Sequence, residues 1–260
     1  MIYYRKKLLN NLAEIWYNSD EIPNKKIDIL RYKFVKKINK NKFFFEELYT
    51  LLINMKLEEK ELLSNFRKNT RYEINRALNK DKIKCSTLLE YGNNNISKIN
   101  EYIKYYNSFA KSKNRSSINI KELENFIICR NLCIRYAFID TTIITMHAYV
   151  ISDSIARLHQ SCSLFRNEDN TETRNMIARG NRLLHWDDII YFKNLGLNIY
   201  DLGGWYGGSI NKEQLLINNF KESFGGYKKK EYSYIVPVTF FGYISVIVHS
   251  LIKFLYSLKS

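Results

Sequence analysis

The segment FKESFGG places a lysine, Lys221, directly after an aromatic residue, Phe220. A lysine ammonium is a compact positive charge that can stabilise a developing oxyanion or hold a phosphate group. The adjacent phenylalanine could fix the position of that charge. Lys221 and Phe220 are therefore candidate catalytic residues, and the alternative is a solvated lysine on a short helix.

A histidine and a serine lie two residues apart in the segment ARLHQSCSLFR. Side chains alternate along a β-strand, so His159 and Ser161 are predicted to share one face and to point into one cleft. An imidazole titrates near neutral pH and can act as a general base. His159 is a candidate catalytic residue and Ser161 a candidate substrate-binding residue, with a structural histidine as the alternative.

The segment YDLGG predicts a buried strand that runs into a glycine turn. Asp201 precedes Gly203 and Gly204, and a carboxylate in that place could orient an amine or cap the following loop. Asn181 is predicted to cap or line the site at the start of a long helix. These four residues are candidates for substrate binding.

A basic helix is predicted in KLEEKELLSNFRKNTRYEINRALNK, whose apolar residues recur every three or four positions. Arg71 and Arg76 fall on its other faces. A guanidinium binds phosphate oxygens in bidentate fashion, so both could clamp the phosphates of a nucleotide-linked or lipid-linked acceptor. The alternative is a solvated basic face.

The composition is that of a globular protein, with 45% hydrophobic and 15% aromatic residues, and it excludes a disordered chain. A net charge of +15 favours polyanionic partners such as RNA, nucleotide-linked substrates or an anionic membrane, although a bland basic surface would give the same number. The four cysteines form no CxxC pair, which favours free thiols and predicts no metal site. The first residues lack the pattern of a signal peptide, so we expect a cytoplasmic protein.

The order of the predicted elements is that of a mixed α+β fold, in which a mostly antiparallel sheet is flanked by helices. Residues 1–60 predict strands and short helices, and residues 132–165 predict three strands in an antiparallel meander. The remaining predicted elements are a helical stretch over 56–80, a strand over 83–90, helices over 96–110, 120–130 and 175–195, a strand over 197–204, a helix over 214–224 and a strand over 232–237.

Four segments in this order resemble the Fem-type transferases (FemAB family) of the GNAT acyltransferase superfamily: residues 66–77, 156–166, 181–204 and 220–226. The resemblance implies a GNAT-like fold, acyl transfer to an amine, and a catalytic role for the Phe220–Lys221 pair. It also suggests three parts: a reduced N-terminal GNAT-like subdomain over 1–60, a GNAT/FemAB-like acyltransferase domain over 61–236, and an amphipathic helix over 237–260.

The diphosphate-binding signature of GNAT enzymes has a poor counterpart here. Its best alignment is residues 177–182, where Ile177 replaces Gln or Arg and Arg182 replaces a small residue. Acetyl-CoA is therefore less supported as donor, and the resemblance implies aminoacyl-tRNA. No tightly bound cofactor is expected.

We accordingly expect an N-acyltransferase that moves an aminoacyl or other acyl group to an amine of a cell-envelope precursor, for peptidoglycan or surface polysaccharide. The acceptor would be a nucleotide-linked or lipid-linked sugar. One alternative is an acyl-CoA-dependent N-acetyltransferase that acts on an amino sugar. Another is a non-catalytic GNAT-fold module that binds RNA or membrane.

The segment after Pro237 predicts an apolar helix with one narrow polar stripe. Binding to a membrane surface, docking on the protein body or a second subunit, and spanning of a bilayer remain open, although Lys253 and His249 make spanning costly. Surface binding predicts a peripheral location at the inner face of the membrane. The stripe consists of Thr239, Gly242, Ser245, His249, Lys253, Ser257 and Ser260.

Overall fold

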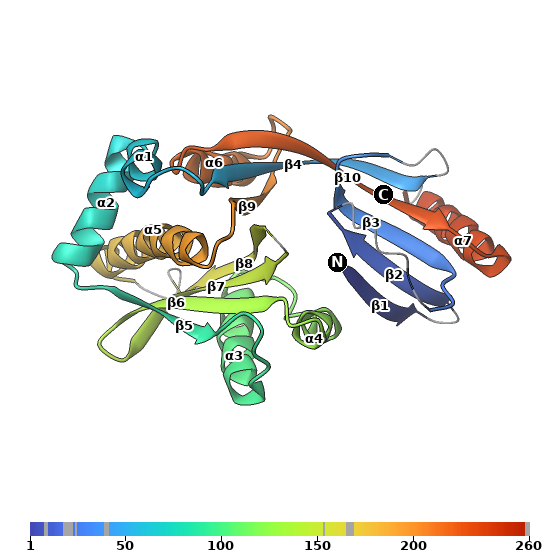
Figure 1. The fold of residues 1–260 in the computed structure, drawn as a ribbon, viewed down its shortest axis with the longest axis horizontal. Coiled ribbons are helices and arrows are strands. Elements are labelled where there is room, and N and C mark those ends of the chain that lie inside the picture. Colours follow the sequence, from blue (N-terminus) through green and yellow to red (C-terminus); the bar gives the residue numbers. More distant parts are fainter. Residues whose placement is uncertain are drawn as a thin grey trace. The chain divides into compact units, whose positions relative to one another are not determined.

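The computed structural model describes residues 1–7, 10–17, 23, 25–38, 42–152, 154–164 and 169–257, with side chains up to residue 252. The chain forms two compact units (Figure 1). Unit 1 comprises residues 1–49 and 229–260, and unit 2 comprises residues 50–228. The three-part division expected from the sequence stays a prediction.

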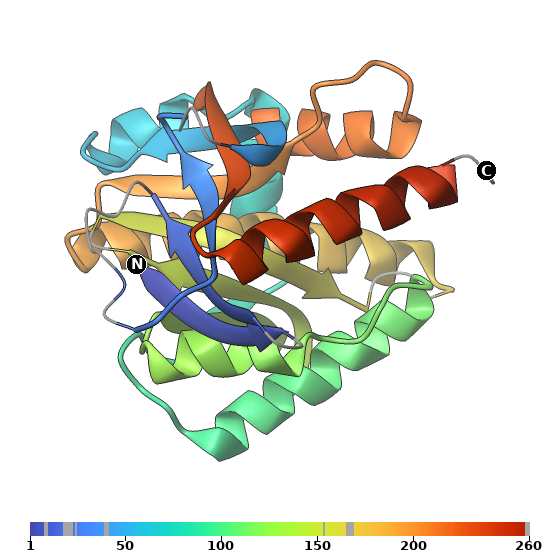
Figure 2. The same ribbon diagram turned by 90° about the vertical axis from the view of Figure 1, so that its right-hand side faces the viewer.

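Unit 1 is a small mixed sheet with one helix. Antiparallel pairing joins β1 to β2 and β3 to β10, whereas β2 and β3 run parallel. The helix α7 packs beside this sheet (Figure 2), and its Val246 contacts Leu12 and Ile29 in a small apolar cluster. The elements are β1 (Ile2–Lys7), β2 (Asn10–Trp16), β3 (Ile29–Val35), β10 (Tyr227–Pro237) and α7 (Phe240–Ser257).

The expectation of short helices in the first 60 residues is wrong for most of that segment. Its described part up to Asn54 contains strands and no helix. The run FFFEELYTLLIN forms one strand, β4 (Phe43–Asn54), whose last residues are buried in succession. Aromatic and β-branched residues favour an extended backbone, and a strand covered on both sides carries a continuous apolar run.

Unit 2 contains a sheet in the order β4-β9-β8-β7-β6-β5. The predicted antiparallel meander is confirmed, because β6, β7 and β8 pair in this manner, and β5 extends it. The strands are β5 (Lys84–Leu89), β6 (Leu132–Ile139), β7 (Thr142–Ile151), β8 (Ile155–Ser163) and β9 (Ile199–Trp205). Of the expected third run, residues 154–165, Phe165 lies outside the described residues.

Helices cover both faces of the meander (Figure 1): α2 and α5 lie on one face, and α3 and α4 on the other. A core of apolar side chains fills the space between α2, α5 and the sheet. The predicted α+β class, with a mostly antiparallel sheet flanked by helices, is therefore confirmed. The helices are α1 (Glu59–Ser64), α2 (Lys68–Asn79), α3 (Ile96–Ser112), α4 (Ile120–Ile128), α5 (Thr171–Asn194) and α6 (Lys212–Glu222).

Two helix boundaries differ most from the expectation. The helical stretch over 56–80 is broken into α1 and α2, and Arg67 at the break donates its main-chain N–H to Ser223 O. The long helix α5 begins at Thr171, four residues early, because the Asn170 side chain accepts from the N–H groups of Glu172 and Thr173. Its end agrees with the prediction, since Gly196 follows with φ 82°.

Candidate active site

The strands β8 and β9 pair in parallel over only three residues, up to Arg157 and Asp201. Beyond that point, β8 contains a β-bulge and β9 contains Gly203 with φ 75°. A Cβ on Gly203 would lie 2.9 Å from Leu158 O, so this position requires glycine. Gly204 next to it has no atom within 4 Å of a Cβ position, which leaves space beside the loop.

Asp201 holds this loop in place. Its buried carboxylate accepts from Arg157 Nη1 at 2.5 Å and from the N–H of Gly203 at 2.8 Å, and it contacts the Thr50 hydroxyl. Because both side chains are buried, removal of either the Arg157 or the Asp201 charge would leave the other charge buried without compensation. Of the two roles considered for Asp201, this geometry matches the cap of the loop.

Lys221, near the end of α6, points at the same loop. Its Nζ donates to Gly204 O at 2.5 Å. Burial lowers the pKa of Lys221 to about 8, against the opposing effect of the Asp201 carboxylate, while Arg157 lowers it further. The structure therefore brings together Lys221, Asp201, Gly203 and Gly204, which the sequence had singled out separately.

Phe220 anchors the end of α6. Its ring contacts the rings of Phe224 and His185 at centroid distances of 5.2 and 5.6 Å, and the Arg182 guanidinium lies 5.1 Å from its centroid. These contacts hold the Phe220 ring in place, and its role in fixing the position of Lys221 stays a prediction.

Asn181 does not cap α5. It lies ten residues after the first residue of the helix, because α5 starts at Thr171, so the expectation of a cap is wrong. Its Oδ1 lies 2.8 Å from His147 Nε2, 3.2 Å from Thr145 Oγ1 and 3.5 Å from the exposed Ser161 hydroxyl. Asn181 and Ser161 therefore lie together at the exposed end of a buried polar network.

His159 lies elsewhere. It lies at the β-bulge of β8, between Leu158, which pairs with Tyr149, and Gln160, which pairs with Ala148. Its ring packs against Phe126 of α4 at 5.0 Å, on the opposite face of the sheet from Asn181. The expectation that His159 and Ser161 share one face is wrong, because a bulge interrupts the alternation of side chains.

Arg71 and Arg76 occupy different environments. Arg71 Nη1 donates to the main-chain oxygens of Ser64 and Phe66 at 2.8 and 2.6 Å and so closes the corner between α1 and α2. Arg76 is half-buried, and its Nε has no hydrogen-bond partner among the described residues. Their role as phosphate ligands stays a prediction.

Two other arginines line a pocket of about 270 Å³ between α2, α5 and α6. Arg67 and Arg182 line it together with Phe220. Each guanidinium has a carboxylate partner: Arg67 lies 3.3 Å from Glu222, and Arg182 lies 2.8 Å from Glu73. The sequence did not single out these two arginines as site residues.

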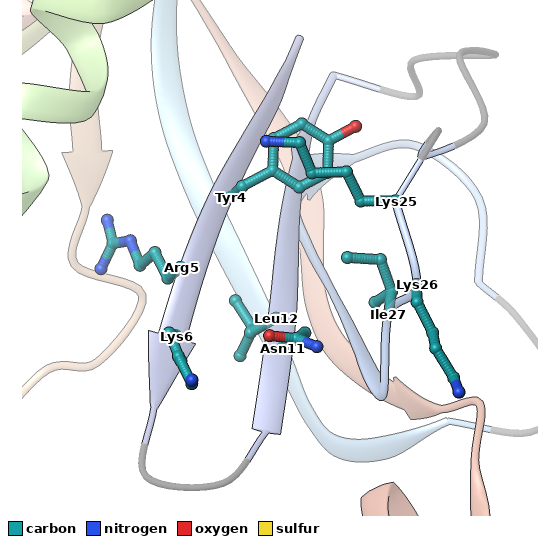
Figure 3. Close-up of a pocket in the computed structure, with 8 residues that line it drawn as sticks. All are labelled: Tyr4, Arg5, Lys6, Asn11, Leu12, Lys25, Lys26 and Ile27. Atoms are coloured by element: carbon teal, nitrogen blue, oxygen red, sulfur yellow. The ribbon is translucent and has the colours of Figure 1, made fainter.

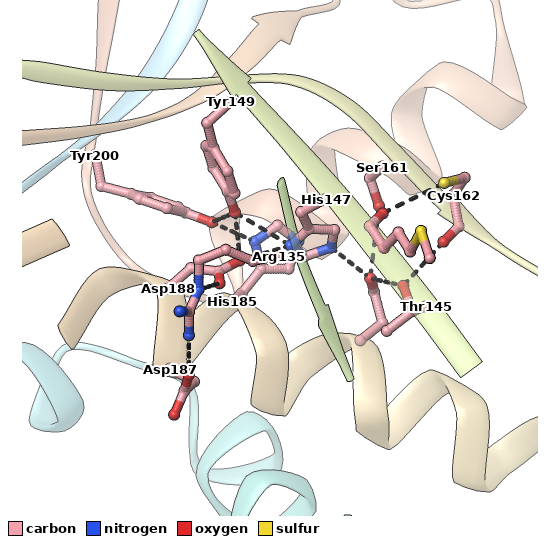
Figure 4. Close-up of polar contacts among 12 residues, drawn as sticks. Arg135, Thr145, His147, Tyr149, Ser161, Cys162, His185, Asp187, Asp188 and Tyr200 are labelled. Atoms are coloured by element: carbon pink, nitrogen blue, oxygen red, sulfur yellow. Dashed lines mark hydrogen bonds and ion pairs between the residues drawn. The ribbon is translucent and has the colours of Figure 1, made fainter. Parts of the chain in front are cut away.

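A buried polar network lies between β7 and α5 (Figure 4). Asp188 accepts from Arg135 Nε at 2.6 Å, lies 2.7 Å from His147 Nδ1, and accepts from the Tyr149 hydroxyl at 2.5 Å. The Tyr149 hydroxyl continues to Tyr200 at 2.7 Å. Because nearly every member is hydrogen-bonded, the network holds α5 rigidly on the sheet.

His185 ends this network on the side of Lys221. Its Nδ1 lies 2.7 Å from the Tyr200 hydroxyl, and its ring lies 4.3 Å from that of His147. Burial lowers the pKa of His185 well below its ordinary value, and the charges of His147, Lys221 and Arg182 act in the same direction. His185 is therefore neutral at physiological pH and lies between the Tyr200 hydroxyl and the His147 ring.

The segment aligned with the diphosphate signature, residues 177–182, lies inside α5. Its main-chain N–H groups are engaged in helical hydrogen bonds and cannot receive a diphosphate. Gly180 serves packing, because a Cβ there would collide with the Ile144 side chain. At the actual helix start, Asn170 occupies two N–H groups and Glu172 adds a negative charge.

No group of three or more metal-ligating side chains occurs among the described residues. Likewise, within the described part of the chain, no helix is long and apolar enough to cross a membrane.

Solved structures share this fold. FemX has a TM-score of 0.62 at 11% sequence identity, and the match covers 90% of this chain and 84% of FemX. The C-terminal domain of a protein named as a lysylphosphatidylglycerol synthetase from Agrobacterium fabrum has a TM-score of 0.58 at 11% identity, over 96% of this chain and 84% of that domain. L-PGS from Bacillus licheniformis has a TM-score of 0.55 at 10% identity, over 95% of this chain and 84% of that one.

No family model and no curated protein sequence matches the chain. At these low identities the structural matches establish the fold. The chain has the fold of FemX, and the resemblance noted in the sequence is confirmed at the level of the fold.

Proposed function

We propose that this protein is an N-acyltransferase that moves an aminoacyl group from tRNA to an amine of a cell-envelope precursor. The observation that carries the proposal is the position of Lys221: a half-buried ammonium held at Gly204 O, where β8 and β9 part. The known structures of this fold include FemX and proteins named for a lysyl-lipid product, which supports aminoacyl transfer to envelope components.

The reaction needs a positive charge near the carbonyl group of the donor. The acceptor amine attacks the ester carbon, a C–N bond forms, and the carbonyl oxygen becomes an oxyanion. The C–O bond to the tRNA ribose then breaks, and the ribose hydroxyl leaves with the proton that the amine loses. The Lys221 ammonium would stabilise the oxyanion, and the open space at Gly204 would admit the acyl group.

The acceptor class follows from the same proposal. A nucleotide-linked or lipid-linked amino sugar or peptide carries phosphates, and the net charge of +15 favours such a substrate. A lipid-linked acceptor would place the enzyme at the inner face of the membrane.

A side-by-side binding titration at fixed moderate salt tests the donor. Purified protein is titrated with aminoacyl-tRNA, uncharged tRNA and acetyl-CoA. We expect aminoacyl-tRNA to bind more tightly than uncharged tRNA, and acetyl-CoA to bind weakly. Tight binding of acetyl-CoA would instead favour an N-acetyltransferase that acts on an amino sugar. Equal, salt-dependent binding of both tRNAs without turnover would favour a non-catalytic RNA-binding module.

A further inference from the structure

The helix α7 packs on its own sheet through its polar side. Thr239 Oγ1 donates to Asp28 Oδ1 at 2.7 Å, and Ser245 contacts the side chain of Asn10. The His249 ring lies 5.5 Å from that of Phe44. Gly242 lets the helix approach closely, because a Cβ there would collide with Asp28 O. The polar stripe expected from the sequence therefore faces the protein as far as its side chains are described.

The apolar side of α7 is exposed along its whole described length. Phe240 and Phe241 are 76% and 73% exposed, and Ile247 and Leu251 are 51% and 57% exposed. Phe240, Ile244, Ile247 and Leu251 follow one another at spacings of three and four residues, which places them on one face, and the Phe241 ring lies beside that of Phe240. Tyr243, Ile244, Val248 and Ile252 are exposed by 41–47% as well, and Val238 precedes the helix with 53%. A contiguous apolar surface of this kind marks an interaction site.

The charge around this face is positive. No acidic residue follows Glu231 in the sequence, and unit 1 contains 15 lysines and arginines against 7 aspartates and glutamates. Arg31 lines the groove beside Ile244 and Val248. The Asp28 carboxylate lies beside the first residues of α7. Hydrogen bonds from Asn11 and Thr239 lower the pKa of this carboxyl most, and the nearby positive charge of Lys26 lowers it further.

Lys26 also belongs to a basic pocket of about 380 Å³ in the same unit (Figure 3). Arg5, Lys6 and Lys25 line it too, and no carboxylate is among its lining residues. A pocket with four cationic groups fits the phosphate of a lipid headgroup. Through the contacts of Asp28 with Asn11 and Thr239, this pocket is joined to the first turn of α7.

We propose that α7 attaches this protein to the surface of a bilayer that contains anionic phospholipids. Its apolar face lies among the acyl chains near the headgroups, while the lysines and arginines of unit 1 contact headgroup phosphates. One side of α7 is packed on the sheet, so the helix lies along the membrane and is not surrounded by lipid. The excess of lysines and arginines over acidic residues in unit 1 favours this occupant over an uncharged surface. The inference does not rest on the proposed acyl transfer.

Vesicle sedimentation without any acyl donor tests the proposal. The full chain is mixed with vesicles of phosphatidylglycerol and phosphatidylcholine, or of phosphatidylcholine alone. We expect binding to the anionic vesicles that weakens as salt is raised from 0.1 to 0.5 M, about tenfold or more. The double variant Phe240→Ser/Phe241→Ser should bind at least about tenfold more weakly, while its thermal unfolding is unchanged because both rings are exposed.

The matched control is Ile128→Ser/Ile210→Ser, which removes two side chains of unit 2 that are 77% and 88% exposed. It should bind vesicles like the unmodified chain. Equal binding by the Phe240/Phe241 variant, or no binding by the unmodified chain, would overturn the proposal. A third outcome would also overturn it: sedimentation velocity shows a dimer of the unmodified chain and a monomer of the Phe240/Phe241 variant, and neither protein binds vesicles. A second copy of the chain would then cover this face.

Discussion

Removal of the Lys221 charge should abolish most of the acyl transfer. Lys221→Met takes away an ammonium held at the open loop and replaces it with an apolar side chain of similar length. The loss of one oxyanion-stabilising group costs about 10²–10³-fold in turnover, or about 3–4 kcal/mol. We expect a decrease of this size in initial rate, with binding of aminoacyl-tRNA changed far less, because the oxyanion exists only in the transition state.

The pH dependence gives a sharper form of the same prediction. With a pKa of about 8, Lys221 is about nine-tenths charged at pH 7 and about one-tenth charged at pH 9. Lys221→Arg keeps its charge throughout this range. The rate of the unmodified enzyme divided by that of Lys221→Arg should therefore fall about tenfold from pH 7 to pH 9, and the ratio cancels the titration of the acceptor amine.

A ratio that rises through pH 8 would refute the reasoning, because the neutral amine would then act as a general base. A near-normal rate in Lys221→Met would refute any role of the residue in the reaction. Lys212→Met, on the same helix and exposed to solvent, is the matched control and should keep full activity. Thermal unfolding of each variant separates loss of chemistry from loss of fold.

Three further predictions concern the scaffold of the site. Asp201→Asn leaves the Arg157 charge buried without its carboxylate, so the free energy of unfolding should fall by about 3–5 kcal/mol and Tm by about 6–20 °C. Gly203→Ala should cost about 1–2 kcal/mol, since φ is 75° and the Cβ meets Leu158 O, whereas Gly204→Ala has room and should be nearly neutral. His185 stays neutral in the folded chain but takes up a proton in the unfolded chain below about pH 6.5. The free energy of unfolding should therefore fall by up to about 1.4 kcal/mol per pH unit from about pH 6.5 to about pH 5. The fall should be smaller in His185→Phe.

Denaturant unfolding checks all three. An unchanged midpoint in Asp201→Asn would show that Arg157 does not need the carboxylate. Equal effects of alanine at Gly203 and Gly204 would contradict the backbone geometry of the loop. A His185→Phe variant with the same loss of stability in acid as the unmodified chain would assign that loss to other groups.

Much of the fold follows from local patterns in the sequence. The three strands of the meander carry runs of β-branched and apolar residues separated by turn residues, and they pair as predicted. The glycines of YDLGG lie at the end of a strand, as expected. FKESFGG lies at the end of a helix, also as expected. Glycine at the end of a strand or helix is a clear local signal.

Tertiary contacts decide what the sequence did not predict. The bulge that moves His159 to the other face depends on the pairing of β8 with β7 and leaves no local signal. The start of α5 depends on Asn170, one of several polar residues that could have served as its cap.

The buried network was missed although it left a signal. Thr145, His147 and Tyr149 alternate along β7, so they face one side of the sheet. His185 and Asp188 are spaced by three along α5, within reach of that face. Polar residues at every second position of a strand, combined with polar residues on the apolar face of a helix, predict a buried hydrogen-bond network.

The measurement that tests the central claim most directly is transfer of a labelled amino acid from aminoacyl-tRNA to nucleotide-linked and lipid-linked envelope precursors. The ester to tRNA is hydrolysed by mild alkali, whereas an amide product is not, so alkali-resistant label reports the new C–N bond. We expect alkali-resistant label with the unmodified enzyme and at least about a hundredfold less with Lys221→Met. Equal label with both proteins, or label from acetyl-CoA alone, would contradict the account.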